Sequence, residues 1–121
     1  MPLLLMSFLL LSFSPQKIHE PIQTPSAKYF IVIFSPGPQW NHEISPRDQP
    51  GMKEHSANLQ KLRKDGMIAV GARYSDKGMV VIKGDSLDAV KNLFADDPMV
   101  KENVFMMEVY EWKPFYKGSV E

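Results

Sequence analysis

Residues 28–34, KYFIVIF, are the segment that most restricts how this chain can fold. Their β-branched and aromatic side chains are typical of a β-strand, in which successive side chains point to opposite faces of a sheet. Each face then carries three of them: Tyr29, Ile31 and Ile33 on one, and Phe30, Val32 and Phe34 on the other. Because both faces of this strand are apolar, each needs a covering layer of helices or of another sheet.

Residues 51–66, GMKEHSANLQKLRKDG, predict an amphipathic helix between two glycines. Its N-cap is expected at Asp48 or Gln49, with Pro50 in the first turn, where proline is tolerated. Gly66 is the expected C-terminal stop. One stripe of the helix consists of Met52, His55, Leu59 and Leu62. His55 is the polar residue in this otherwise apolar stripe.

Two further strands are predicted after this helix, at residues 67–74 and 79–83. The short turn SDKG joins them, and its Gly78 is expected to take a positive φ. The two strands therefore form an antiparallel hairpin.

The segment GDSLDAVKNLFADDP predicts a second helix. Its N-cap is expected at Asp85 or Ser86, and the helix should end before Pro98, because proline disfavours helical backbone in the residue before it. After the short turn MVKEN, residues 104–112 predict the last strand.

The order strand, helix, strand, strand, helix, strand is the split βαβ order (βαββαβ) of ferredoxin-like folds, an α+β architecture. We expect an antiparallel sheet with two helices on one face. The last strand is also apolar on both sides, with Met106, Tyr110 and Trp112 opposing Phe105, Met107 and Val109. Since the helices cover only one face, we expect the other to pack on a second copy of the chain in a homodimer.

The N-terminal part divides the chain into residues 1–27, a leader and linker, and residues 28–121, the folded domain. The apolar run at residues 3–13 is shorter than the roughly 20 residues of a membrane span and resembles the core of a signal peptide. No Lys or Arg precedes the run and no A-x-A site follows it. Two alternatives follow: export to the periplasm or the extracellular space, with no stable membrane span after leader removal, or a start-site artefact on a cytoplasmic protein.

Composition excludes several classes of function. Fourteen Lys and Arg balance 14 Asp and Glu, and the basic residues are scattered, so nucleic acid is not an expected partner. The absence of cysteine excludes thiol catalysis and thiolate metal sites. The three histidines, His19, His42 and His55, have no metal-ligand spacing, so we expect neither a metal nor a cofactor.

His55 is the candidate for chemistry because helical spacing directs it toward the sheet. Either it is a buried histidine bonded to backbone, or it acts in catalysis. Asp96 and Asp97 end the second predicted helix, on the same side of the sheet, where a carboxylate can reach His55. Such a contact would fix the tautomer of the ring and leave the other nitrogen free to accept a proton. The alternative for these aspartates is an exposed pair at a helix C-terminus, where the macrodipole is unfavourable.

Several short motifs, taken in order, resemble the YciI-like (YCII-related) domain family. They are SPGPQW, the EH of the first helix, L..G, the glycine at Gly71, D..G, DSL.A and A.DP.V. The resemblance runs over about residues 29–115. It implies the ferredoxin-like, dimeric α/β-barrel fold, in agreement with the order of elements.

The resemblance also implies a site. Members of the family share a histidine and an aspartate proposed as a catalytic centre, and these match His55 and Asp97, while Asp96 falls outside the match. This chain has GAR where many members have Gly-Pro, so Arg73 is expected to affect which substrate fits.

The leading hypothesis is a small-molecule enzyme in which His55 abstracts a proton next to a carbonyl or lactone, while Asp97 orients the ring. Such chemistry belongs to isomerases and lyases. Arg73 is the candidate to bind an anionic substrate and Trp40 the candidate to cap the pocket; the alternatives are a solvated arginine and ordinary loop packing. A second hypothesis is a dimeric module that binds a small molecule without chemistry. A haem-degrading or quinone-forming monooxygenase shares only the topology.

Overall fold

The computed structural model describes residues 11–15 and 27–119, so most of the predicted leader and linker lies outside the described residues. The eight elements are β1 (Tyr29–Pro36), the 3-10 helix η1 (Pro46–Asp48), α1 (Met52–Lys64), β2 (Ile68–Tyr74), β3 (Lys77–Lys83), α2 (Leu87–Asn92), α3 (Pro98–Lys101) and β4 (Phe105–Glu111). Within the described part, no helix is both long and apolar enough to cross a membrane.

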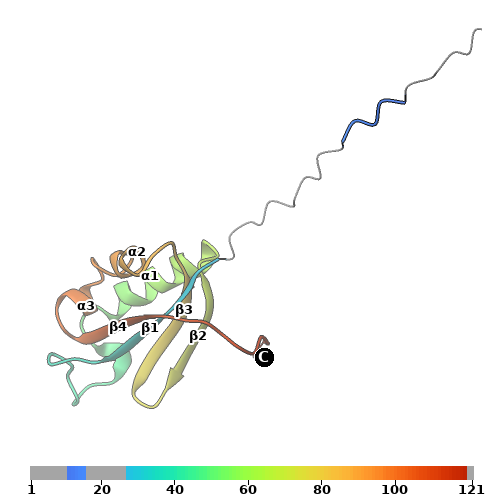
Figure 1. Cartoon of the computed structure of the whole chain (residues 1–121). Coiled ribbons are helices and arrows are strands. Elements are labelled where there is room, and N and C mark those ends of the chain that lie inside the picture. Colours follow the sequence, from blue (N-terminus) through green and yellow to red (C-terminus); the bar gives the residue numbers. More distant parts are fainter. Residues whose placement is uncertain (1–10, 16–26, 120–121) are drawn as a thin grey trace, which may run out of the picture.

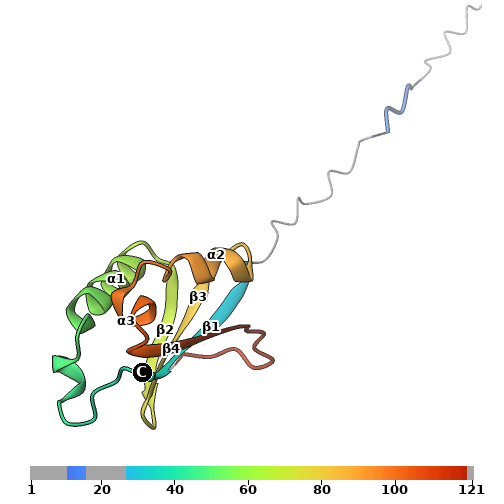
Figure 2. The ribbon, with the colours of Figure 1, turned by 90° about the vertical axis from the view of Figure 1, so that its left-hand side faces the viewer.

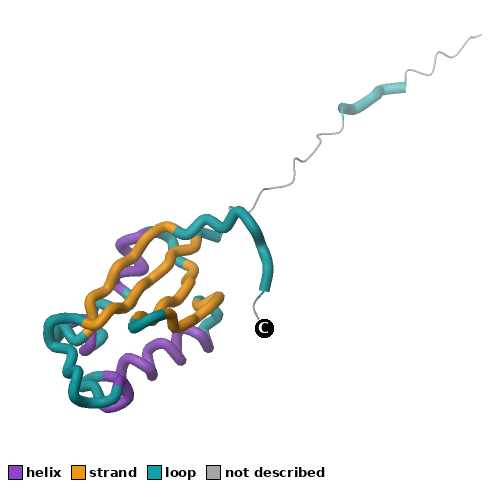
Figure 3. Tube along the Cα trace, turned by 90° about the horizontal axis from the view of Figure 1, so that it is seen from below, coloured by secondary structure: helices purple, strands orange, loops and turns teal. Residues whose placement is uncertain are grey.

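The four strands form one antiparallel sheet in the order β2-β3-β1-β4. Figures 1 and 2 show the helices together on one side of this sheet, and Figure 3 shows the strands side by side from below. The predicted ferredoxin-like arrangement is therefore confirmed, with two short helices, η1 and α3, added to the two that the sequence indicated.

The hydrophobic core lies between the sheet and the helices. Strand β1 contributes Phe30, Val32 and Phe34, each at most 2% exposed, and Leu62 of α1 packs with them. Phe94, which follows α2, is fully buried in the same cluster. Full burial of a side chain of this kind contributes about 1.5–3 kcal/mol, so the alternation within β1 is a main source of the stability of the fold.

The opposite face of the sheet is largely apolar, carries Glu108 among its apolar side chains, and has no helix on it. On β4, Met106 and Tyr110 are 51% and 52% exposed, and Ile31 and Ile33 of β1 are half-buried beside them. The Tyr110 hydroxyl donates a hydrogen bond to Glu108 Oε2 at 2.5 Å, and this bond and the charge of Glu108 raise the pKa of Tyr110. Of the two apolar faces of β1, one is thus buried under the helices and the other remains on an open face of the sheet.

The start of α1 corrects the prediction. Neither Asp48 nor Gln49 is the N-cap: the helix is capped by Gly51 at φ 83°, and Pro50 lies before the helix. A side chain on Gly51 would press on Met99 at the start of α3, so the close approach of the two helices favours glycine here. Gly66 ends α1 at φ 75°, as predicted.

The hairpin turn also differs from the prediction. Strand pairing continues to Tyr74 and Lys77, so only Ser75 and Asp76 connect the strands. The left-handed residue is Ser75 at φ 52°, and Gly78 is an ordinary strand residue of β3. Because β3 begins at Lys77, earlier than predicted, the turn is two residues long instead of four.

The segment after α2 holds the third correction. Helix α2 ends at Asn92, and Pro98 begins the short helix α3 where a turn was predicted. Asp97 is the N-cap of α3 rather than the C-terminal residue of the preceding helix. A carboxylate is favourable at a helix N-terminus, so the expected conflict with the macrodipole does not arise.

Replacing Gly37 with alanine should lower the free energy of unfolding by about 1–3 kcal/mol, because the added Cβ overlaps the backbone carbonyl of Asn103, which cannot rotate away. Gly78→Ala is the matched control, since nothing lies within 4 Å of a Cβ at Gly78. Urea unfolding of the two variants measures the difference. Equal midpoints for Gly37→Ala and the wild type would contradict the close packing at the end of β1.

Candidate functional site

A buried histidine and a buried aspartate lie in contact beneath α1. His55 is 5% exposed, Asp97 is 4% exposed, and His55 Nδ1 lies 2.5 Å from Asp97 Oδ2. The other oxygen of Asp97, Oδ1, accepts the backbone N–H of Met99 at 3.0 Å. The start of α3 therefore holds the carboxylate, and the carboxylate holds the ring.

This contact selects one form of the imidazole. An ionised carboxylate only accepts hydrogen bonds, so Nδ1 carries the hydrogen that it donates to Asp97. In the neutral ring, Nε2 then has the free lone pair. Among the described residues, Nε2 of His55 has no hydrogen-bond partner, and His55 lines a pocket. The ring can therefore accept a proton from a molecule in that pocket.

Aromatic side chains hold the orientation of the His55 ring. Phe34 and Phe105 contact it edge to face, with ring centroids 4.8 and 5.1 Å away. Trp40 stacks on Phe105 at 5.5 Å with an interplanar angle of 23°. Three aromatic rings from β1, β4 and the loop after β1 thus form one wall beside the histidine.

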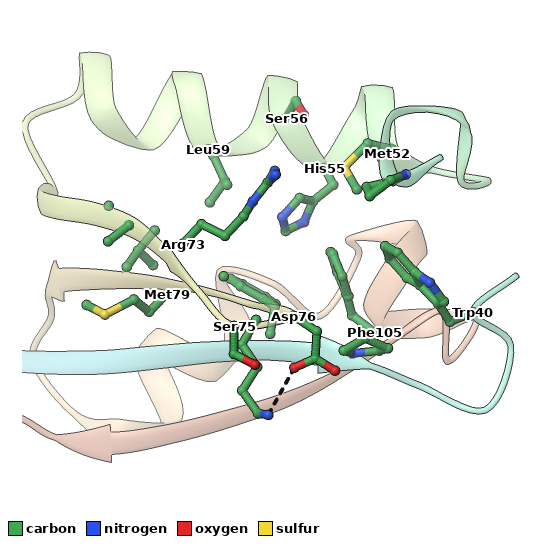
Figure 4. A pocket seen from close by; sticks show the side chains of 18 of the residues that line it. Trp40, Met52, His55, Ser56, Leu59, Arg73, Ser75, Asp76, Met79 and Phe105 are labelled. Atoms are coloured by element: carbon green, nitrogen blue, oxygen red, sulfur yellow. Dashed lines mark hydrogen bonds and ion pairs between the residues drawn. The ribbon is translucent and has the colours of Figure 1, made fainter. Parts of the chain in front are cut away.

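The pocket is an open cleft of about 710 Å³ between α1 and the β2–β3 hairpin, shown in Figure 4. Its apolar lining includes Phe34, Trp40, Met52, Leu59 and Phe105, and its polar lining includes His42, His55, Ser56, Arg73, Asp76 and Lys77. Every residue of β2 after Ile68 is exposed, because β2 is an edge strand with the cleft over its inner face and the open side of the sheet on its other face.

Three of the four site residues expected from the sequence line this cleft. They are His55, Arg73 and Trp40, while Asp97 lies behind His55. Figure 4 shows the Arg73 side chain extending from β2 toward the His55 ring. His42, in the loop after β1, is exposed and also lines the cleft. Within the described part of the chain, no three His, Cys, Asp or Glu residues are grouped to hold a metal ion.

Gln49 is a residue of the site region that the sequence analysis missed. Its side chain is 3% exposed, accepts the Asn41 N–H at 3.0 Å and donates to the Asn41 carbonyl at 2.7 Å. These bonds close the loop that carries Trp40. Both partners are backbone groups eight residues away, and no local pattern signals such a contact.

The chain matches a family model described as the YCII-related domain over residues 30–113, more than half of its length. A search of curated proteins gave no match. Among solved structures, the chain is similar to 5-chloro-2-hydroxyhydroquinone dehydrochlorinase from Burkholderia phenoliruptrix AC1100, in complex with 2,5-dihydroxybenzoquinone. That match has 20% sequence identity and a TM-score of 0.45, and covers 69% of this chain and 93% of the other.

Replacing Gln49 with leucine should lower the free energy of unfolding by about 1–3 kcal/mol, because it leaves the N–H and carbonyl of Asn41 without their partner. Gln39→Leu, an exposed glutamine of the same loop, is the control and should change stability by less than about 0.5 kcal/mol. Chemical denaturation compares the two. If both variants unfold at the wild-type midpoint, the buried amide does not hold the loop.

Proposed function

Because the chain belongs to the YCII-related domain family, we propose that it is a small-molecule enzyme in which His55 is a general base and Asp97 positions it. One observation carries this proposal: Nδ1 of His55 is bound to a buried carboxylate while the ring lines an open cleft. A histidine with only a packing role does not need a charged partner below it and a cleft above it. The pair supports proton abstraction.

The reaction begins at a carbon next to a carbonyl or lactone group. Nε2 of His55 takes the proton, the electrons of the C–H bond move into the carbonyl to form an enolate, and the ring becomes an imidazolium. The Asp97 carboxylate stabilises that positive charge without taking a proton itself. In an isomerase the imidazolium returns the proton to a different carbon. In a lyase the enolate electrons expel a leaving group from the adjacent carbon.

A second function is a dimeric module that binds a small molecule in the same cleft without chemistry. The breadth of the cleft and its aromatic wall favour binding in either case. The two functions differ in whether the protein exchanges a carbon-bound proton, so an exchange experiment separates them.

Deuterium exchange tests the base. Each member of a panel of lactones and keto acids is incubated with the protein in heavy water, and the loss of α-proton signals is followed by NMR. The His55→Gln variant should exchange about 10² to 10⁴-fold more slowly than wild type, the range of general base catalysis. Asp97→Asn should also lose rate, by up to about 10⁴-fold, because an amide no longer selects the tautomer.

Asp96→Asn is the matched control for the aspartate, since Asp96 is exposed and has no contact with His55. It should exchange at the wild-type rate and keep the wild-type unfolding temperature. His55→Gln and Asp97→Asn disturb a buried pair, so they should unfold at a lower temperature while remaining folded under the assay conditions. Equal exchange in His55→Gln and wild type would refute the base. If panel members raise the unfolding temperature but exchange no proton, the binding module is the better account.

We also propose that the functional unit is a homodimer joined through the open sheet face. The support is the half-exposed apolar surface of β1 and β4, which includes Ile31 opposite Tyr110 and, beyond Glu108, Met106. A contiguous apolar patch of several hundred Å² marks an interaction site more often than a solvated surface.

Met106→Lys should shift the protein from dimer to monomer, because it places a charge in the apolar surface proposed as the interface. Gln60→Lys, which adds the same charge on the exposed side of α1, should remain dimeric. Light scattering at low micromolar concentration reads out both. A monomeric wild type would end this part of the proposal.

A further inference from the structure

We infer that the cleft selects ligands with an apolar body and a single carboxylate, and that Arg73 binds the carboxylate. The position of the reacting carbon in this inference rests on the function proposed above. The selection of charge does not, because a binding module would show it equally.

Among the described residues that line the cleft, Arg73 is a cation without a carboxylate partner. At the tip of the hairpin, Lys77 Nζ lies 3.2 Å from Asp76 Oδ1, so these two charges largely cancel. Arg73 forms no ion pair with any described residue, and its side chain points across the cleft toward His55 (Figure 4). A guanidinium binds a carboxylate through two parallel hydrogen bonds, a geometry that a neutral ligand does not match.

The strand register explains why Arg73 is free to act in this way. Its partner across the ladder is Gly78, and the preceding residue on the same face is Gly71. A Cβ at Gly78 would meet nothing within 4 Å, so the space beside Arg73 is open. Two glycines thus remove the side chains that would otherwise fill the cleft next to the guanidinium.

The other lining residues specify an apolar body for the ligand. The stacked rings of Trp40 and Phe105 form one wall, and Met52 and Leu59 of α1 contribute further apolar surface. Aromatic faces bind flat, apolar groups well. A small inorganic anion would leave this surface uncovered, so charge alone is not enough for tight binding.

If Arg73 binds a carboxylate and His55 acts as the base proposed above, the substrate carries two separate oxygen groups. The carboxylate at Arg73 is an anchoring group, and the carbonyl that acidifies the carbon–hydrogen bond is a separate group nearer His55. The substrate class is therefore a keto acid or a lactone acid, in which one group binds and the other reacts.

Three probes of the same shape test the selection of charge: benzoate, benzamide and benzamidine, which are negative, neutral and positive. Isothermal titration calorimetry of the full chain should show benzoate binding about 10 to 100-fold more tightly than benzamide, the range of a charge-assisted pair. Benzamidine and inorganic phosphate should bind more weakly than benzoate. Arg73→Met, which keeps an apolar stem, should remove the preference, and Arg73→Lys should keep part of it.

Arg63→Met is the matched control, because Arg63 is an exposed arginine of α1 outside the cleft, and it should keep the preference for benzoate. The inference is overturned if benzamide binds wild type as tightly as benzoate, if none of the probes binds, or if Arg73→Met keeps the preference. His55→Gln separates the two proposals. A preference that survives in His55→Gln supports selection by Arg73 even if proton exchange fails, whereas a preference lost there assigns the charge to the ring and overturns the role of Arg73.

Discussion

The rest of the site depends on the two hydrogen bonds that the Asp97 carboxylate accepts. One oxygen caps α3 through Met99, and the other accepts the hydrogen of His55, so a single side chain joins the starts of two structural units. Gly51 lets α1 approach Met99 closely enough for this contact. A buried carboxylate with both oxygens bonded is stable in an apolar interior, whereas an unpaired one is not.

The aromatic residues of the cleft belong at the same time to the core. Phe34 contacts Phe94 of the core at 5.3 Å between ring centroids and the His55 ring at 4.8 Å. The packing that stabilises the fold therefore also fixes the angle of the imidazole. Close-packed interiors transmit small displacements, so core substitutions near Phe34 are expected to disturb the site as well as stability.

Local patterns were sufficient to predict the strands, the order of the elements along the chain and the side of α1 on which His55 lies. Alternation and helical spacing depend only on near neighbours. The residues left the contact partner open between Asp96 and Asp97, and the family resemblance selected Asp97. The helix terminus was predicted wrongly, since a proline can begin a helix as well as end one. The N-cap at Gly51 and the turn at Ser75 depend on tertiary contacts and ladder length. The role of Gln49 depends on backbone groups that no sequence pattern identifies.

Strand β2 belongs to two surfaces of the protein at once. Arg73 points into the cleft, while its neighbour Tyr74 and the earlier Val70 project from the opposite side of the sheet, where both are more than 40% exposed. Residues adjacent in sequence therefore act on separate surfaces. During divergence, single substitutions along β2 can alter the cleft without altering the opposite sheet face, or the reverse. An insertion of one residue would exchange the side chains on the two faces and change both surfaces together.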